Sequence, residues 1–444
     1  MTLSKNKKYQ YFFFLILSIF IIFNGGNSNL FIQLNFVLVS LFFLYCLKDK
    51  NYYIHLQNFY SKIKIQLFFY LIFLLFLIFQ IINFPIEFLF ILSPEKHKIL
   101  ILLENTTYSS ISFSPSNSFF QILNYLTLIF IVFICKIIFY KEIHKYRFFL
   151  FLSLSGFVSS VVAVLFYFIG NPDLFIFENS FYKSSSSGFF INRTIFSIFL
   201  LFCMISSLEL LKYYDLNKTY KKDYFFNKIY VRLFLIFITI GIITSFSRIG
   251  NFLLLFTVLS YLINEILFSK SKINSFRIVI IFIIFFDILI LGIYFGSSQI
   301  FNRFYFLRDE FGSISDDIIN TSRFDIIRFG LIELKNYIFF GYGAGGFENL
   351  FKLNFSISSN EYADHVHSDI IEFLGEFGLV GFILIALSFI KFFFDKKIYV
   401  FVNNLLIFYL IIILLFDFSL HTPLIQILFI FFFILNNKST TQFH

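Results

Sequence analysis

Residues Gly341–Gly381 read GYGAGGFENLFKLNFSISSNEYADHVHSDIIEFLGEFGLVG and lie where a long polar segment gives way to an apolar run. Glycines, acidic residues and two closely spaced histidines are concentrated here, whereas most of the surrounding chain is hydrophobic. A polar segment that leads directly into a long apolar run is typical of a loop that enters a membrane helix. We therefore expect this stretch to decide both the local architecture and the chemistry of the protein.

The composition of the chain indicates a membrane protein. Of its 444 residues, 59% are hydrophobic and 14% are charged, against roughly 25% charged residues in a soluble domain. Long apolar runs with few charges recur from end to end, and they should be helices because the bilayer core offers no water to backbone groups. The three cysteines lie inside apolar runs without metal-ligand spacing, which predicts neither a disulfide nor a zinc site. We predict an all-α, polytopic membrane protein.

The apolar runs define about twelve candidate membrane spans. The first span is expected to stay uncleaved, because the residues after it lack a cleavage pattern. With a cytoplasmic N-terminus, the predicted cytoplasmic segments hold most lysines and arginines and the short outer segments hold almost none. Topology thus explains the net charge of +9 better than nucleic-acid binding does. The predicted spans are residues 11–23, 30–47, 65–84, 119–140, 148–170, 189–211, 229–244, 249–268, 277–296, 371–394, 399–416 and 421–436.

Two predicted outer segments are long, residues 85–118 and residues 297–370. In the first, residues 85–103 are expected to lie along the membrane surface. The second is inserted between the ninth and tenth spans, and loops of this length are usually functional. Its residues 320–336 have helical periodicity. We expect a single integral membrane domain, residues 1–444, that carries this large loop.

The segment Asp364–Asp369 places His365 and His367 two residues apart between acids. One interpretation is a solvated helix start, with Ser368 or Asp369 as its cap. A metal site is a second interpretation, although residues two apart on a helix face different ways and no third ligand is evident. A general base is the third, because the unperturbed pKa of histidine lies near neutral pH.

The glycine-rich segment Gly341–Phe347 does not match a nucleotide-binding loop. It lacks the lysine of a phosphate-binding loop, and it does not follow a strand with a ribose-binding acid downstream. It is either a flexible turn or a tight turn whose backbone approaches a substrate or a functional helix.

Arginines on the predicted outer side are the third feature. Arg248 interrupts an apolar stretch, and a charge there is costly unless it is paired, which makes it a functional candidate. Arginine binds phosphate oxygens through a bidentate fork, so several outer arginines indicate an anionic ligand. For the loop arginines, pairing with acids of the same loop is the alternative. The other outer arginines are Arg193, Arg303, Arg323 and Arg328.

The segment Asp417–Pro423 lies between the last two predicted spans. Asp417 and His421 are four residues apart and can meet on one helix face. The alternative is an Asp-capped turn with the proline in the first helical turn.

Together these motifs resemble the O-antigen ligase and O-antigen polymerase superfamily, whose members carry a large outer loop between the ninth and tenth spans. The ligase-type signature is His, then Ser, Asn or Gln, then nine residues, then Gly-x-x-Gly. It is matched from His367 to Gly381, with Glu376 at the acidic position of the family. The other matched segments are Thr244–Arg248, Ser322–Arg323, Gly341–Phe347 and Asp417–Pro423, with a looser match at Gly188–Asn192.

The resemblance implies a cofactor-free, metal-independent, inverting glycosyl transfer on the periplasmic face of the bacterial inner membrane. The implied donor is a glycan on undecaprenyl pyrophosphate, the implied catalytic base is His367, and His365 would be a neighbour that contacts the acceptor. The implied pyrophosphate-binding residues are Arg248, Arg323, Arg328 and Arg303. The implied supporting residues are Glu376, Asp417, His421 and Arg193, and the implied structural glycines are Gly341, Gly343, Gly378 and Gly381.

Two alternatives stay open at this point. The signature spacing favours a ligase, which uses lipid A core as acceptor, over a polymerase, which joins repeat units. A transporter of lipid-linked sugars would carry intramembrane charges in many helices, whereas this chain has few and has one long outer loop. The expected partners are therefore the lipid-linked donor, the glycan acceptor and membrane lipid, without nucleic acid.

Overall fold

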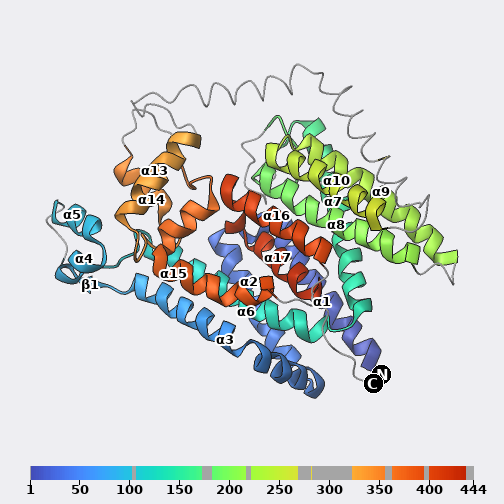
Figure 1. Ribbon diagram of the computed structural model, residues 1–444, viewed down its shortest axis with the longest axis horizontal. Helices are drawn as coiled ribbons and strands as arrows, with labels where there is room; N and C mark the ends of the chain where they lie inside the picture. Colours follow the sequence, from blue (N-terminus) through green and yellow to red (C-terminus); the bar gives the residue numbers. More distant parts are fainter. Residues whose placement is uncertain are drawn as a thin grey trace.

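The computed structural model describes residues 2–102, 107–172, 183–216, 222–268, 282, 323–355, 363–394 and 400–436. Helices make up nearly all of the secondary structure in these ranges, which confirms the predicted all-α class (Figure 1). The exception is a two-residue antiparallel bridge between β1 (Phe84–Pro85) and β2 (Tyr108–Ser109).

The elements follow the apolar pattern of the sequence. The N-terminal elements are α1 (Thr2–Ile22), η1 (Asn24–Gly26), α2 (Asn29–Leu47), α3 (Lys50–Ile81), α4 (Ile86–Leu92) and α5 (Pro94–Leu102). The central elements are α6 (Pro115–Ile138), α7 (Glu142–Ile169), α8 (Arg193–Leu216), α9 (Lys222–Thr244) and α10 (Arg248–Phe268). The C-terminal elements are α13 (Arg323–Asn336), α14 (Phe347–Asn354), α15 (Asp369–Phe394), α16 (Val400–Phe416), η2 (Ser419–His421) and α17 (Pro423–Asn436).

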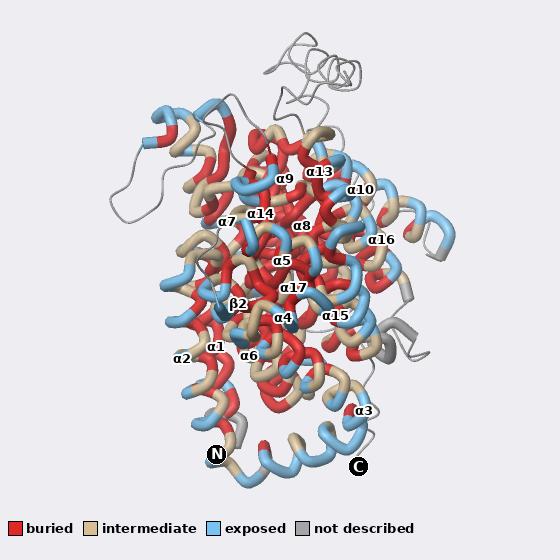
Figure 2. The backbone as a smooth tube through the Cα atoms, turned by 90° about the vertical axis from the view of Figure 1, so that its left-hand side faces the viewer, coloured by how far each residue is buried: buried red, intermediate tan, exposed pale blue. Residues whose placement is uncertain are grey.

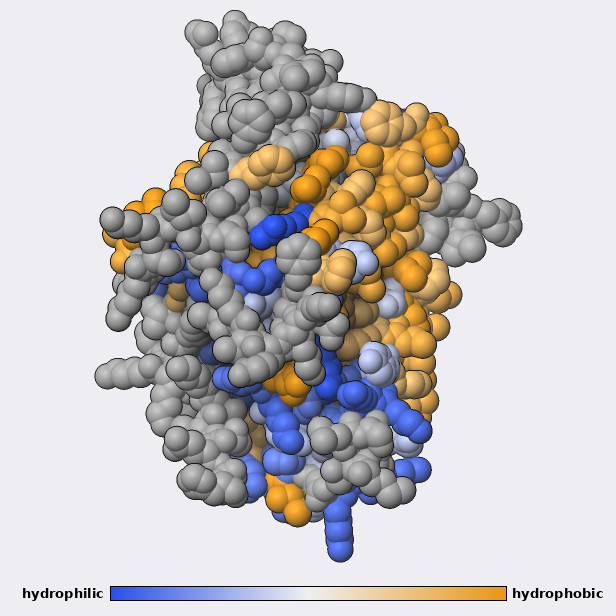
Figure 3. Space-filling model, turned by 90° about the vertical axis from the view of Figure 1, so that its right-hand side faces the viewer, coloured by the Kyte–Doolittle hydropathy of each residue, from blue (hydrophilic) through white to orange (hydrophobic). Residues whose placement is uncertain are grey.

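Eight helices of the described residues are long and apolar enough to cross a membrane, and α16 and α17 are shorter apolar helices. Except for residue 282, the predicted ninth span lies outside the described residues, as do residues 297–322 and 356–362 of the large loop, so the count of twelve stays a prediction. Helix α8 is buried along almost its whole length and forms the centre of the bundle with α17 (Figure 2). On the side of α9 and α10, apolar side chains form a broad surface (Figure 3), as expected of a lipid-facing side.

The predicted outer segments meet at one end of the bundle. The backbone N–H of Ile191 donates to Asn24 Oδ1 at 3.0 Å, and that of Asp369 donates to the carbonyl of Asp417 at 2.8 Å. At the opposite end, Lys145 Nζ donates to Asn436 Oδ1 at 2.8 Å. The helices therefore alternate in direction as the charge pattern requires, while the assignment of the two ends to cytoplasm and periplasm stays a prediction.

Helix α15 is interrupted at Gly378, where φ is +61° and ψ is −177°. A neighbouring loop replaces the lost helical hydrogen bonds, since Leu379 N donates to the carbonyl of Ile338 at 2.7 Å. The fully buried Gln80 of α3 ties the two segments together, donating from Nε2 to the carbonyls of Phe340 at 2.7 Å and Glu376 at 2.8 Å. The first two turns of α15 are thus held by the loop as well as by their own helix.

Helices α13 and α14 belong to the described part of the predicted large loop. Helix α13 confirms the helix expected at residues 320–336 and begins at Arg323 in the structure. They share a small aromatic core in which Phe329 packs edge-on against Phe351 and Phe355. Helix α13 packs against α15, so this core lies directly over the start of α15 (Figure 1).

The described part of residues 85–103, the segment expected along the membrane surface, contains the two short helices α4 and α5. The buried Lys96 of α5 donates from Nζ to the carbonyls of Ser110 and Ser112, both at 2.7 Å. Phe113 N in turn donates to the carbonyl of Tyr342 at 3.0 Å. This chain of contacts supports the glycine-rich turn from the side of α5.

Candidate active site

Three carboxylates form the floor of the site. Asp369, Glu372 and Glu376 occupy positions i, i+3 and i+7 of α15, so they share one helix face, and each is at most 2% exposed. Each accepts a backbone N–H from a different segment. These bonds are Leu420 N to Asp369 Oδ2 at 2.9 Å, Val366 N to Glu372 Oε2 at 2.8 Å and Gly345 N to Glu376 Oε1 at 2.6 Å. The carboxylates thereby join the histidine loop, the η2 turn and the glycine-rich turn.

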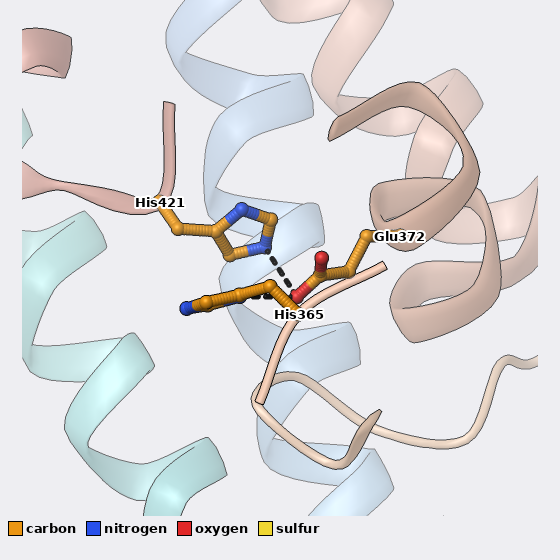
Figure 4. A group of neighbouring side chains, drawn as sticks. All are labelled: His365, Glu372 and His421. Atoms are coloured by element: carbon orange, nitrogen blue, oxygen red, sulfur yellow. Dashed lines mark hydrogen bonds and ion pairs between the residues drawn. The ribbon is translucent and has the colours of Figure 1, made fainter. Parts of the chain in front are cut away.

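Two imidazoles lie on this floor (Figure 4). His365 Nδ1 is 2.7 Å from Glu372 Oε1, and His421 Nδ1 is 2.6 Å from Asp369 Oδ1. His421 Nε2 lies 3.5 Å from both Glu372 Oε1 and Glu376 Oε2. A carboxylate that is ionised only accepts hydrogen bonds, and Nδ1 of each ring is then the donor. Burial lowers the pKa of His421, but Glu372, Asp369 and Glu376 outweigh burial and hold that pKa well above its ordinary value.

The pairing expected between Asp417 and His421 does not form, because the ring of His421 is turned toward Asp369 instead. The carboxylate of Asp417 accepts a hydrogen bond from the Ser419 hydroxyl, and its backbone carbonyl accepts the N–H of Asp369. Burial raises the pKa of Asp417. Asp417 therefore stabilises the η2 turn, which is closer to the alternative interpretation of a capped turn.

His367 is held in an unusual backbone conformation, with φ at +62°. Such a conformation is uncommon for a residue other than glycine, and strained residues cluster at functional sites. Its Nδ1 is buried and has no hydrogen-bond partner among the described residues. Burial, followed by the charges of Arg323 and His365, lowers the pKa of His367 to about 4. The imidazole is therefore neutral at ordinary pH.

The environments of the two neighbouring histidines push their pKa values in opposite directions. His365 stacks on Phe418 with ring centres 4.5 Å apart, whereas His367 meets the same ring edge-on at 5.1 Å. Burial lowers the pKa of His365, but the charge and hydrogen bond of Glu372 outweigh burial and raise it. One loop thus presents two imidazoles with opposite pKa shifts on the same phenylalanine.

The predicted arginines differ in where the structure places them. Arg323 begins α13, and its charge acts on both His367 and Asp417, so the structure brings it to the site. Arg328 lies farther along α13 and is exposed, and Arg303 lies outside the described residues. Arg248 and Arg193 are the first residues of α10 and α8.

The starts of α8 and α10 are neighbours, because Ser247 Oγ donates to Thr194 Oγ1 at 3.3 Å. Just before Arg248, Phe246 has φ at +51°, which is a strained value for a bulky residue. Helix α8 also packs against η2, the turn that carries His421. The Arg193–Arg248 pair of helix starts therefore lies at the same end of the bundle as the histidine loop.

The four predicted glycines lie where backbones approach closely. Gly341 has φ at +73°, and a Cβ there would overlap the carbonyl of Glu376. At Gly378, a Cβ would overlap the carbonyl of Phe339. Gly343 faces Ser112 and Gly381 faces the ring of Phe76. The glycine-rich turn can therefore lie against α15 and donate its Gly345 N–H to Glu376.

His365, Glu372 and His421 also offer nitrogen and oxygen atoms within 4.8 Å of one another, a spacing that would admit a metal ion. The group therefore contains the third possible metal ligand that the sequence did not make evident. Of the two loop histidines, however, it includes His365 and not His367. The 2.7 Å between His365 Nδ1 and Glu372 Oε1 is a hydrogen-bond distance, whereas two ligands on a tetrahedral zinc ion lie about 3.3 Å apart. We interpret the group as hydrogen-bonded imidazoles.

Sequence reasoning missed Asp369, Glu372 and Gln80 as site residues. The signal for the two acids was present, because Asp369, Glu372 and Glu376 are three acids at helical spacing at the start of an otherwise apolar span. Ionisable residues within membrane spans are functional candidates by default. Gln80 has no such signal, because its partners are backbone carbonyls more than 250 residues away in sequence.

Residues 233–386 match the family described as O-Antigen ligase. The matched range begins in α9 and ends in α15, so it contains Arg248, both loop histidines and all three carboxylates, but not His421. No curated protein matches the chain.

Proposed function

Because residues 233–386 match the O-Antigen ligase family, we propose that the chain is a glycosyltransferase of the O-antigen ligase type. The proposed donor is a glycan on undecaprenyl pyrophosphate, and the proposed acceptor is a hydroxyl group of lipid A core. The proposed location is the bacterial inner membrane, with the N-terminus in the cytoplasm and the site on the periplasmic face. The membrane spans and the family support lipid-linked glycans as substrates in general.

The observation that carries this proposal is the state of His367. It is neutral, strained and without a partner at Nδ1 in the described part of the chain, and it lies within the field of Arg323. A neutral imidazole beside an arginine suits a reaction in which a hydroxyl loses a proton while a phosphate leaves.

In the proposed reaction, the acceptor oxygen attacks the anomeric carbon from the face opposite the pyrophosphate. The new C–O bond forms as the bond between the anomeric carbon and the phosphate oxygen breaks, so the configuration inverts. The hydroxyl proton passes to His367, and the leaving pyrophosphate keeps the bonding electron pair. Arg323, Arg248, Arg328 and Arg303 are the proposed counter-charges for the pyrophosphate.

Donor binding would also prepare the base. Arg323 is one of the charges that lower the pKa of His367. A pyrophosphate bound at Arg323 offsets this charge, so the pKa of His367 rises toward the working pH, where a general base is most effective. The base is then strengthened only when the donor is in place.

The proposal is tested with His367→Ala in purified protein supplied with lipid-linked donor and lipid A core. We expect loss of glycan transfer with normal membrane insertion, and full transfer by this variant would refute the assignment. Addition of a chelator should leave transfer unchanged if the reaction is metal-independent.

A polymerase is the second candidate, because the two activities share the matched family. A cell that lacks the protein distinguishes them. Loss of glycan on lipid A core together with donor accumulation indicates a ligase, whereas core that carries single repeat units indicates a polymerase.

A further inference from the structure

The proposed reaction uses His367 but leaves the orientation of His365 unexplained. Glu372 binds Nδ1 of His365 at 2.7 Å, and Glu372 is itself fixed by the N–H of Val366 at 2.8 Å. Phe418 covers one face of the ring, with the two ring planes only 16° apart. The imidazole therefore has one defined orientation.

In that orientation, Nε2 of His365 points away from both Glu372 and His421 (Figure 4). The side chain is 20% exposed, whereas the side chain of Glu372 is 1% exposed. Because Nδ1 faces Glu372 and one ring face lies on Phe418, the outward part of the ring includes the Nε2 edge. The structure thus buries the carboxylate and presents the far end of the imidazole.

We propose that His365 is a cationic anion-binding residue whose Nε2–H donates a hydrogen bond to a phosphate oxygen of the donor. This inference rests on the proposed function and gives His365 a role toward the donor, in place of the acceptor contact implied by family resemblance. Glu372 is then a positioning residue that orients the ring and keeps it charged.

The charges around His365 support a cation at this position. Glu372 of α15 lies beneath it and Asp364 lies in its own loop, while Asp369 and Glu376 interact with the neighbouring His421. Among the described residues, the positive group that acts on His365 is His421, whereas Arg323 acts on the neighbouring His367.

An anion also fits this position better than a hydroxyl. The buried Glu372 compensates the charge of the imidazolium at Nδ1, while Nε2 lies on the side of the ring away from Glu372 (Figure 4). Hydrogen bonds between a charged donor and a phosphate oxygen are short and about twice as strong as neutral ones. The neutral His367 then accepts the proton. The two histidines thus have different roles, as pairs of groups with oppositely shifted pKa values do in other enzymes.

The test measures binding of dibutyl pyrophosphate, a diester probe whose two negative charges stay constant from pH 5 to pH 9, by calorimetry on the full-length protein in detergent. We expect His365→Gln to bind the probe roughly tenfold more weakly, because one charge-assisted hydrogen bond is lost. His365→Arg keeps a positive charge and should recover most of the affinity. His97→Gln, a matched histidine change on α5, should leave binding unchanged.

The wild-type protein provides a test without mutation. Its affinity for the probe should fall as pH rises through the raised pKa of His365, and the fall should be smaller in His365→Arg, where His421 still titrates but residue 365 does not. Equal affinity of wild-type and His365→Gln protein across this pH range would overturn the proposal. So would a His365→Gln variant that binds the probe normally but has lost glycan transfer, because His365 would then act in the chemical step.

The two proposals can fail separately. His367→Gln should bind the probe normally and lose glycan transfer. If it keeps transfer while His365→Gln loses probe binding, the role proposed for His367 is wrong and the anion-binding role of His365 stands.

Discussion

Gln80→Met is the most informative perturbation of the architecture that supports the site. Methionine has a similar length but no donor, so the carbonyls of Phe340 and Glu376 both lose a hydrogen bond. The Phe340 carbonyl loses the partner described for it, at a cost of about 1–3 kcal/mol. The Glu376 carbonyl keeps the N–H of Gly343 at 3.1 Å, so its loss is nearer ~1 kcal/mol.

Part of this loss of stability is offset. Gln80 Oε1 is a buried acceptor without a partner among the described residues, and methionine removes it. The net destabilisation is therefore about 2 kcal/mol. Since the same bonds hold the loop against the carboxylates of α15, glycan transfer should fall along with stability.

The assay compares the melting temperature and the transfer rate of Gln80→Met with those of Gln66→Met in one lipid nanodisc. Gln66 lies on the same helix but is partly exposed, so its replacement should cost less than about 0.5 kcal/mol. If the two variants have the same melting temperature and the same transfer rate, Gln80 does not tie the loop to α15 and the reasoning is wrong.

Three further predictions concern charge and backbone. Arg323→Gln should raise the pKa of His367 from about 4 toward its ordinary 6.5, so the acid limb of kcat/KM should move to higher pH, and an unmoved limb would contradict the described proximity. The raised pKa of His421 stabilises the fold fully below pH 6.5, and this contribution disappears as pH rises through the raised value. The melting deficit of His421→Gln should therefore shrink in alkali, whereas a constant deficit would show that His421 is not charged. Gly378→Ala should cost at least about 1–3 kcal/mol of backbone strain and reduce transfer, whereas Gly170→Ala, in open space at φ +90°, should cost less in a thermal melt.

The class of fold could be predicted from the sequence alone. Apolar runs separated by basic segments have few solutions in a bilayer, so the helical class and the gathering of the outer segments at one end could be predicted. The resemblance around His367 also led to the family that residues 233–386 match. The roles of the individual site residues stay predictions.

Several contacts of the site could not be read from the chain, and each has a physical reason. Asp417 and His421 are close in sequence, but the η2 turn is not a regular helix, so the i, i+4 rule did not apply and His421 met Asp369 instead. The break at Gly378 was hidden because glycine is also common in unbroken membrane helices. Gln80 joins backbone atoms, which have no sequence signature.

The break in α15 also bears on how the site meets the bilayer. Membranes differ in hydrophobic thickness, and a spanning helix responds mainly by tilting. A continuous α15 would carry that tilt straight to the carboxylates at its first turns. With the helix interrupted at Gly378, and with the turns above it fastened to Gln80 and to residues 338–343, the segment from Gly381 onward can change its tilt alone. Lipid composition then alters the tilt of the helix after Gly381, while the spacing of the three carboxylates is set by the protein.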